Sequence, residues 1–112
     1  MSKIRGTYGA PTVLINNAGV AMMKTILDET EAQIVKTFEV NIISHFILVK
    51  EVLPAMIEHN HGHIVTLASL ASYVAIAQNV DYSCTKAATL AFHEGLAAEI
   101  RARYRAPGIR TT

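Results

Sequence analysis

Three side chains in the second half of this 112-residue chain have the types and spacing that acid and base chemistry needs. Tyr82 and Lys86 are four residues apart in a stretch typical of a helix, so both should lie on one helix face. The positive charge of the lysine favours the phenolate, and we therefore expect it to lower the pKa of Tyr82 from its ordinary value of about 10. A tyrosine tuned in this way suits proton transfer at neutral pH.

A serine precedes this pair. Residues 64–68 form an apolar run rich in β-branched side chains, typical of a buried strand, and Ser69 follows directly. Open α/β sheets bind their ligands at the carboxyl ends of the strands, which would bring Ser69 close to Tyr82. Each residue also has a simpler interpretation when taken singly: a half-buried aromatic, a solvated helix lysine and a cap.

The remaining elements are those that would position these groups. Residues 12–15 form a short strand without alternation, as expected where both faces of a parallel sheet are covered. A helix should begin after Thr30, with Gln33 completing a capping box. Apolar residues then recur at spacings of three and four and predict a stripe facing the sheet: Ile34, Phe38, Ile42, Phe46, Val49, Leu53 and Ile57.

A second apolar set widens this stripe in the later half of the helix: Ile43, Ile47, Leu48 and Val52. We therefore expect this helix to be buried on two sides, against a partner subunit or further parts of the fold. The alanine-rich helix that carries Tyr82 should end at residues 106–108, and residues 109–112 should start another strand. The order strand, helix, strand, helix, strand predicts an α/β fold with a parallel sheet.

Composition narrows the class of protein. A chain with 51% hydrophobic and 17% charged residues is globular, and a net charge of +1 predicts no nucleic-acid partner. The single cysteine, Cys84, rules out an internal disulfide and fits a reducing compartment. No apolar run reaches the roughly 18 residues of a membrane span, and the first residues do not resemble a signal peptide. We expect a cytoplasmic protein, with a membrane-anchored longer form left open.

Two polar clusters have simple interpretations. His59, His61 and His63 invite a metal site, but no cysteine or carboxylate cluster completes a ligand shell, and Gly62 suits a helix C-cap or turn. We therefore predict no metal. The arginines after residue 100 are expected on a solvated helix end rather than on a phosphate-binding patch.

Four motifs, in this order, resemble those of the short-chain dehydrogenase/reductase family. Asn16-Asn17-Ala18-Gly19 resembles its N-N-A-G motif, Val40-Asn41 its V-N motif, and Ser69 with Tyr82 and Lys86 its serine and Y-x-x-x-K motif. The resemblance extends from residue 12 to the end of the chain. It implies a partial Rossmann-like, doubly wound parallel sheet, with residues 1–112 forming a single incomplete NAD(P)-binding domain. The family's T-G-x-x-x-G-x-G phosphate loop does not occur, so the likeness is to the middle of the family's fold.

The resemblance also implies roles. It makes Asn41, Ser69, Tyr82 and Lys86 catalytic, and it places Asn16, Ala18 and Gly19, with Tyr82 and Lys86, at the cofactor, either NAD or NADP. From the residues alone, Gly19 fits a tight turn better than a ligand contact, and Asn41 fits a bend or the outer face of its helix. The implied reaction is reversible hydride transfer between the nicotinamide and a small alcohol or carbonyl compound.

Within the family the chain most resembles the branch of 17β-hydroxysteroid and retinol dehydrogenase-like enzymes, which implies a lipophilic substrate. The full-length form is expected to be a homo-dimer or homo-tetramer. Because the phosphate loop is absent, we expect these 112 residues to be inactive alone. The alternative is a non-catalytic fragment that acts as an interaction or dimerisation module through its two-sided apolar helix.

Overall fold

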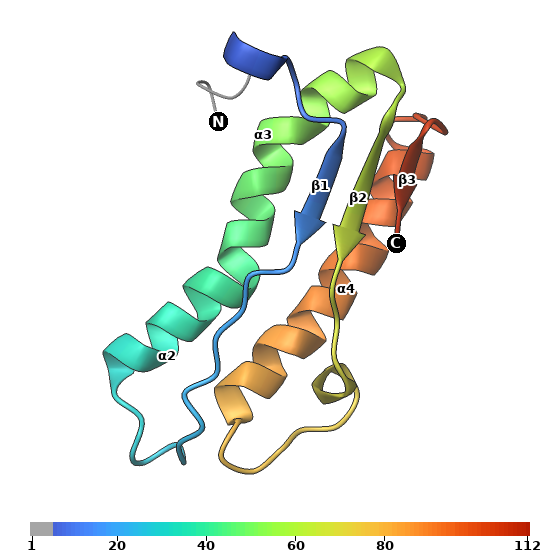
Figure 1. Ribbon diagram of the computed structural model, residues 1–112. Helices are drawn as coiled ribbons and strands as arrows, with labels where there is room; N and C mark the ends of the chain where they lie inside the picture. The colour runs from blue at the N-terminus through green and yellow to red at the C-terminus, as the bar shows by residue number, and fades with distance from the viewer. Residues whose placement is uncertain (1–5) are drawn as a thin grey trace.

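A parallel sheet with two long helices on one of its faces makes up the fold (Figure 1). The computed structural model describes residues 6–112. The strands are β1 (Val13–Asn16), β2 (Gly62–Thr66) and β3 (Ile109–Thr111), and the main helices are α2 (Glu31–Phe38), α3 (Ser44–His59) and α4 (Val80–Ala102). The strand order is β1-β2-β3 with both pairings parallel, which confirms the predicted α/β class and element order.

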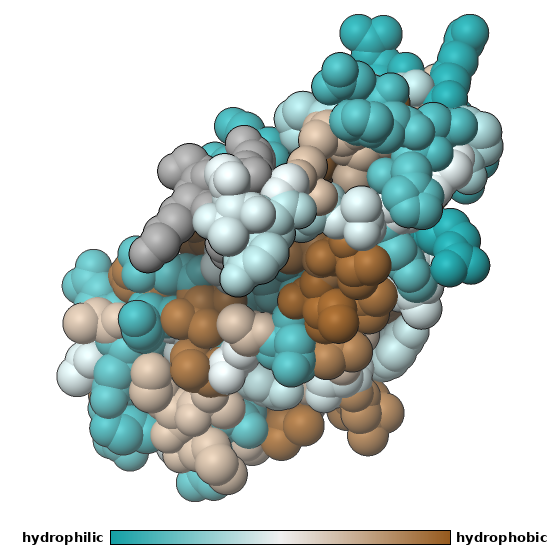
Figure 2. All heavy atoms as spheres, turned by 45° about the horizontal axis from the view of Figure 1, so that its top comes forward, coloured by the Kyte–Doolittle hydropathy of each residue, from teal (hydrophilic) through white to brown (hydrophobic). Residues whose placement is uncertain are grey.

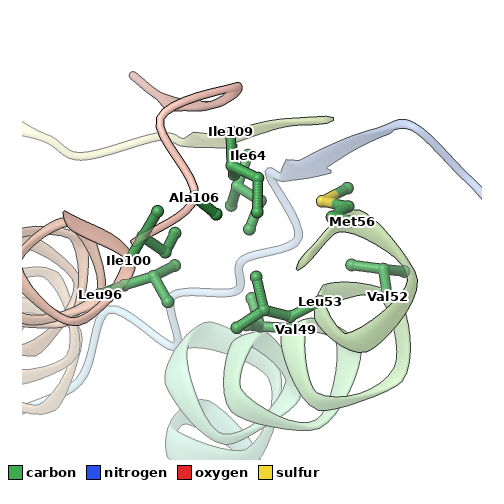
Figure 3. Packing of buried hydrophobic residues seen from close by; sticks show 9 residues of the cluster. All are labelled: Val49, Val52, Leu53, Met56, Ile64, Leu96, Ile100, Ala106 and Ile109. Carbon is green, nitrogen blue, oxygen red and sulfur yellow. The ribbon is translucent and has the colours of Figure 1, made fainter. Parts of the chain in front are cut away.

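The core lies between the sheet and helices α3 and α4 (Figure 3). Its buried side chains are Val49, Val52, Leu53, Met56, Ile64, Leu96, Ile100, Ala106 and Ile109. Ile64 is fully buried because it lies in the central strand and faces this layer. Burial of a large aliphatic side chain contributes about 1.5–3 kcal/mol, so this layer holds the sheet against the two helices.

The opposite face of the sheet is open at β1. Val13 and Ile15 are 56% and 58% exposed, so the expectation that both faces of this strand are covered is wrong for residues 6–112. The reason is topological: successive crossovers in the same direction place α3 and α4 on the same side of the sheet (Figure 1). Figure 2 shows apolar side chains gathered in brown patches on the molecular surface.

The first crossover is one continuous helical segment, Glu31–His59, which contains a π-helix, η1 (Glu39–Ile43), between α2 and α3. The predicted capping box at its start is confirmed. The Thr30 hydroxyl accepts a hydrogen bond from the Gln33 amide at 3.1 Å, and the Gln33 side chain accepts one from the Thr30 amide at 2.9 Å.

The π-helix explains an error in the predicted apolar stripe. Ile42, Val49 and Leu53 are buried as expected, but Phe46 is 52% exposed, and Val52 and Met56 are buried instead. A π-helical turn closes with i→i+5 hydrogen bonds and so adds one residue. That residue rotates the following sequence by about 100° relative to an unbroken α-helix. Beyond Ile43 the predicted stripe is therefore right at Val49 and Leu53, is wrong at Phe46, and omits Met56.

By length and composition alone, the segment Glu31–His59 is long and apolar enough to cross a membrane, with a mean hydropathy of 1.6 over its best window. This differs from the expectation that no such segment exists. The segment supplies Val49, Val52, Leu53 and Met56 to the core, which is the usual arrangement of a core helix on a sheet.

Two element boundaries also differ from the sequence prediction. Asn60, with φ of 47°, is the left-handed C-cap of α3, and Gly62 is instead the first residue of β2. A Cβ on Gly62 would collide with the Met56 side chain, so glycine is needed for close packing of helix on strand. Helix α4 ends at Ala102, four residues before the expected stop, and the chain turns at Arg105, where φ is 50°.

Candidate active site

A pocket of about 590 Å³ opens at the carboxyl ends of β1 and β2. It is lined by the segments that follow these strands and by the start of α4: Asn17, Gly19, Val20, Ala21, Leu67, Ala68, Ser69, Asn79, Tyr82 and Lys86. Four residues singled out from the sequence therefore meet in one pocket, from three separate segments. Three others, Asn16, Ala18 and Asn41, are not part of its lining.

Tyr82 and Lys86 lie one turn apart on α4 and face the pocket together, as predicted. The Lys86 ammonium nitrogen, Nζ, is 5.7 Å from the centre of the Tyr82 ring. Lys86 is only 7% exposed, and its Nζ donates a hydrogen bond to the Leu67 carbonyl oxygen at 3.3 Å. The ammonium group is therefore held beside the Tyr82 ring and is largely sheltered from solvent.

Ser69 reaches the pocket from the loop after β2 rather than directly from the strand end. β2 ends at Thr66 because its partner β1 ends at Asn16. Ser69 is the N-cap of a short 3-10 helix, η2 (Leu70–Ser72), and its oxygen accepts a hydrogen bond from the Ala71 amide at 3.2 Å. Ser69 can therefore act both as a cap and as a ligand-binding residue. Capping uses the hydroxyl oxygen as an acceptor and leaves the hydroxyl proton available to a ligand.

Asn41 is fully buried inside the π-helix, directly behind the pocket. Its Oδ1 accepts a hydrogen bond from the Val20 amide at 2.7 Å, and its Nδ2 donates to the Val20 carbonyl at 2.8 Å and to Thr85 Oγ1 at 3.1 Å. Thr85 donates in turn to the Tyr82 carbonyl at 2.7 Å. Asn41 thus ties the loop after β1 to the helix that carries Tyr82. Its predicted part in proton transfer stays a prediction.

The N-N-A-G segment divides between core and pocket. Asn16 is 2% exposed and lies on the helix-covered side of the sheet, so its side chain does not reach the pocket. Gly19 does line the pocket, and a Cβ there would lie 3.5 Å from Asn41 Oδ1 and 3.8 Å from Lys86 Nζ. Gly19 is therefore the member of this motif best placed to meet a ligand, whereas Ala18 is exposed outside the lining.

His45 belongs to the surroundings of the site and was not found from the sequence. It is 1% exposed, and its ring meets Phe92 edge-on at 6.3 Å. Burial lowers the pKa of His45, the nearby Ala18 backbone opposes this, and the charge of Lys86 lowers the pKa further. The available signal was its position one turn after Asn41, which places both residues on one helix face. Of the other lining residues, Asn17 was found only as a member of the N-N-A-G motif, and Val20 and Asn79 carried no sequence signal.

The histidines after α3 do not converge. His59 Nδ1 lies 2.8 Å from the Ala55 carbonyl oxygen, and His63 Nε2 lies 2.7 Å from Thr112 Oγ1. Within residues 6–112, no group of three or more histidine, cysteine or acidic side chains is arranged to hold a metal ion.

Comparison with known proteins identifies the family of this chain. Residues 1–111 match the family model described as short chain dehydrogenase. Dehydrogenase RED3 of Cochliobolus heterostrophus is 58% identical over 110 residues, which cover 98% of this chain and 56% of that protein. Human 17-beta-hydroxysteroid dehydrogenase 13 is 39% identical over 112 residues, covering 37% of its length. The chain thus spans about half or less of these relatives.

Solved structures have the same fold. A short-chain dehydrogenase from Streptomyces avermitilis matches with a TM-score of 0.86 and 32% identity, over 98% of this chain and 40% of the other. A metagenomic short-chain oxidoreductase in complex with NADP matches with a TM-score of 0.89 and 26% identity, over 99% and 48%. The family model, the relatives and the solved structures agree, and the chain belongs to the short-chain dehydrogenase family.

Proposed function

We propose that this chain is the catalytic part of a nicotinamide-dependent oxidoreductase that interconverts a secondary alcohol and a carbonyl compound. The observation that carries the proposal is the convergence of Ser69, Tyr82 and Lys86 in one pocket at the carboxyl ends of β1 and β2. Relatives named as dehydrogenases, and similar structures in complex with NADH or NADP, support it.

The pocket residues suit a nicotinamide nucleotide. The ammonium group of Lys86 and the hydroxyl group of Tyr82 are donors that can bind the hydroxyls of a ribose. The backbone of Gly19 borders the pocket without a side chain in front of it. When bound, the cofactor accepts or supplies the hydride. The cofactor is either NAD or NADP, since the pocket residues would contact the part that both share.

The protein's own part in the reaction is proton transfer and orientation. The Tyr82 hydroxyl gives a proton to the carbonyl oxygen during reduction and takes one from the alcohol during oxidation. Lys86 stabilises the resulting phenolate, and Ser69 donates a hydrogen bond that orients the substrate oxygen. Asn41 keeps the two walls of the pocket in register through Val20 and Thr85.

We further propose a lipophilic substrate, in keeping with the relatives named as hydroxysteroid dehydrogenases. The loop that follows Ser69 exposes a run of large apolar side chains beside the pocket: Leu70, Tyr73, Val74 and Ile76. An apolar surface bordering a polar reaction site favours a molecule with a hydrocarbon body and one oxygen function.

The test is chemical-shift mapping of the 112-residue chain with NADH and with NADPH. We expect weak binding, because the sequence contains no glycine-rich phosphate loop. The amide signals that shift should be those of Gly19, Ser69, Tyr82 and Lys86. The substitution Gly19→Ala should reduce these shifts at least several-fold while leaving stability nearly unchanged, because its Cβ would meet its neighbours at ordinary van der Waals distances.

Gly95→Ala is the matched control. It adds the same methyl group on α4, where nothing lies within 4 Å, and should leave the nucleotide-induced shifts unchanged. Shifts spread over the surface, or centred away from the pocket, would contradict the proposal. Production of reduced nicotinamide from a lipophilic secondary alcohol, followed by absorbance, would establish the reaction itself.

A second candidate function is self-association without catalysis. A groove of about 500 Å³ between α3 and α4 is lined mainly by apolar side chains, among them Ile42, Phe46, Ala91 and Phe92. An apolar groove between helices suits helix-to-helix contact with a second copy of the chain. This function and catalysis are compatible, since the groove and the pocket share no lining residue.

A further inference from the structure

Two acidic side chains meet beside the pocket where the loop after β1 approaches the start of α4. Glu29 immediately precedes Thr30, the N-cap of α2, and Asp81 lies in the first turn of α4. Asp81 is only 8% exposed, and Glu29 is half-buried. The interaction of Glu29 with Asp81 therefore joins the loop after β1 to the start of α4, in addition to the hydrogen bonds of Asn41.

The two carboxyl groups of Asp81 and Glu29 differ in their partners. Asp81 Oδ1 accepts a hydrogen bond from the Tyr82 amide at 2.8 Å. Its other oxygen, Oδ2, is sealed from solvent and has no donor among residues 6–112, and the same is true of Glu29 Oε1. Ionised carboxylates only accept hydrogen bonds, so two of them in contact are unsatisfied unless one keeps a proton.

The charges around Glu29 favour a proton retained on its carboxyl group. The hydrogen bond with Asp81, then burial, then the negative charge of Asp81 raise the pKa of Glu29, and only the charge of Lys24 on the same loop opposes them. A protonated Glu29 would donate a hydrogen bond to Asp81, whose Oδ1 accepts one from the Tyr82 amide.

We propose that Glu29 is a positioning residue for Tyr82: one proton held between Glu29 and Asp81 fastens the start of α4 to the loop that carries Gly19. The consequence for catalysis rests on the proposed function, since that is what makes the placement of Tyr82 important. Loss of the shared proton sets two like charges against each other and loosens the pocket wall.

The test is an NMR pH titration of the isotopically labelled 112-residue chain, without nucleotide. The Glu29 carboxyl carbon should titrate above the ordinary glutamate value of about 4.3. The Tyr82 amide proton should shift with the same midpoint, because its acceptor Asp81 loses its partner in that step. A contact between Glu29 and Asp81 without a shared proton would not link the two signals.

Variants of Glu29 sharpen this test. Glu29→Gln keeps a donor toward Asp81 and cannot ionise, so the chemical shift of the Tyr82 amide proton should keep its low-pH value at every pH. In Glu29→Ala, which has no donor, this chemical shift should stay near its high-pH value. Glu31→Gln, two residues away and exposed in the first turn of α2, is the control and should leave the titration unchanged.

Three outcomes would overturn the proposal. They are a Glu29 titration in the ordinary range, a Tyr82 amide that does not follow Glu29 or is not dispersed at all, and a titration that changes when EDTA removes divalent cations. Because no nucleotide is present, failure of the proposed nucleotide binding leaves this result standing. A negative result of the pH titration likewise does not affect the interpretation of the chemical-shift mapping with nucleotide.

Discussion

His45 shows how one side chain couples the site to pH. Burial lowers its pKa below the unfolded value of about 6.5, so the folded chain prefers the neutral imidazole. Its contribution to stability is therefore complete above about pH 6.5 and is lost as the pH falls from there through the folded pKa. The residue lies behind the Gly19 loop, so acid should weaken the fold at the site itself.

We expect the urea midpoint of the chain to fall as the pH is lowered from about 7 to about 5. In His45→Gln, which has no titrating group at this position, the fall should be clearly smaller. His59→Gln is the control, because His59 is exposed at the end of α3 and should leave the slope unchanged. The unfolding would be followed by circular dichroism. An equal dependence of the urea midpoint on pH in all three proteins would contradict this explanation.

At the scale of elements, the π-helix η1 is what allows α2 and α3 to serve both the core and the site. Its extra residue turns Asn41 toward Val20 and Thr85 while Val49, Val52 and Met56 still face the sheet. π-Helical turns occur frequently at functional sites for this reason: they redirect a side chain without ending the helix. The loop after β1 and helix α4 are thereby joined through a single amide.

The substitution Asn41→Ala should therefore destabilise the pocket more than the loss of one small side chain would suggest. It removes three hydrogen bonds and leaves the Val20 amide and carbonyl without partners, at an expected cost of about 2–4 kcal/mol in the free energy of unfolding. Hydrogen exchange should accelerate most at the Val20 amide. Asn17→Ala, exposed in the same loop, should cost under about 0.5 kcal/mol. If the two variants cost the same, Asn41 does not hold the loop.

At the scale of the whole molecule, a single helix-covered face leaves much apolar surface accessible. The groove between α3 and α4 and the open face of β1 both expose large hydrophobic residues. A chain of this size buries only about 65% of its unfolded surface, so it has little stability to spare and gains from covering such surface.

We predict that the chain self-associates through the groove between α3 and α4. Phe46→Glu should shift the sedimentation profile toward monomer by placing a charge in the groove. Ile47→Glu is the matched control, because this neighbour is comparably exposed, 57% against 52%, and does not line the groove. Equal effects of the two substitutions, or a monomer at every concentration, would rule the groove out.

Local features of this protein were predictable because their partners are close in the sequence. The capping box joins residues three apart, and Tyr82 and Lys86 share a helix face by the geometry of one turn. The strand at residues 12–15 and the one at 109–112 were each found to within about one residue, since short apolar runs between turns have few alternatives.

The α/β order, the family and the candidate residues for proton transfer could be inferred from the sequence, because these inferences depend on residue type and short spacing. Which candidates share the pocket follows from the fold, which buries Asn16 on the helix-covered side and Asn41 behind the pocket wall. The fold also brings Glu29 to Asp81, two residues that the sequence did not single out as candidates. Such contacts join residues that are dozens of positions apart, and they depend on the crossovers between strands and on the extra residue of the π-helix. Neither feature can be inferred from a local sequence pattern.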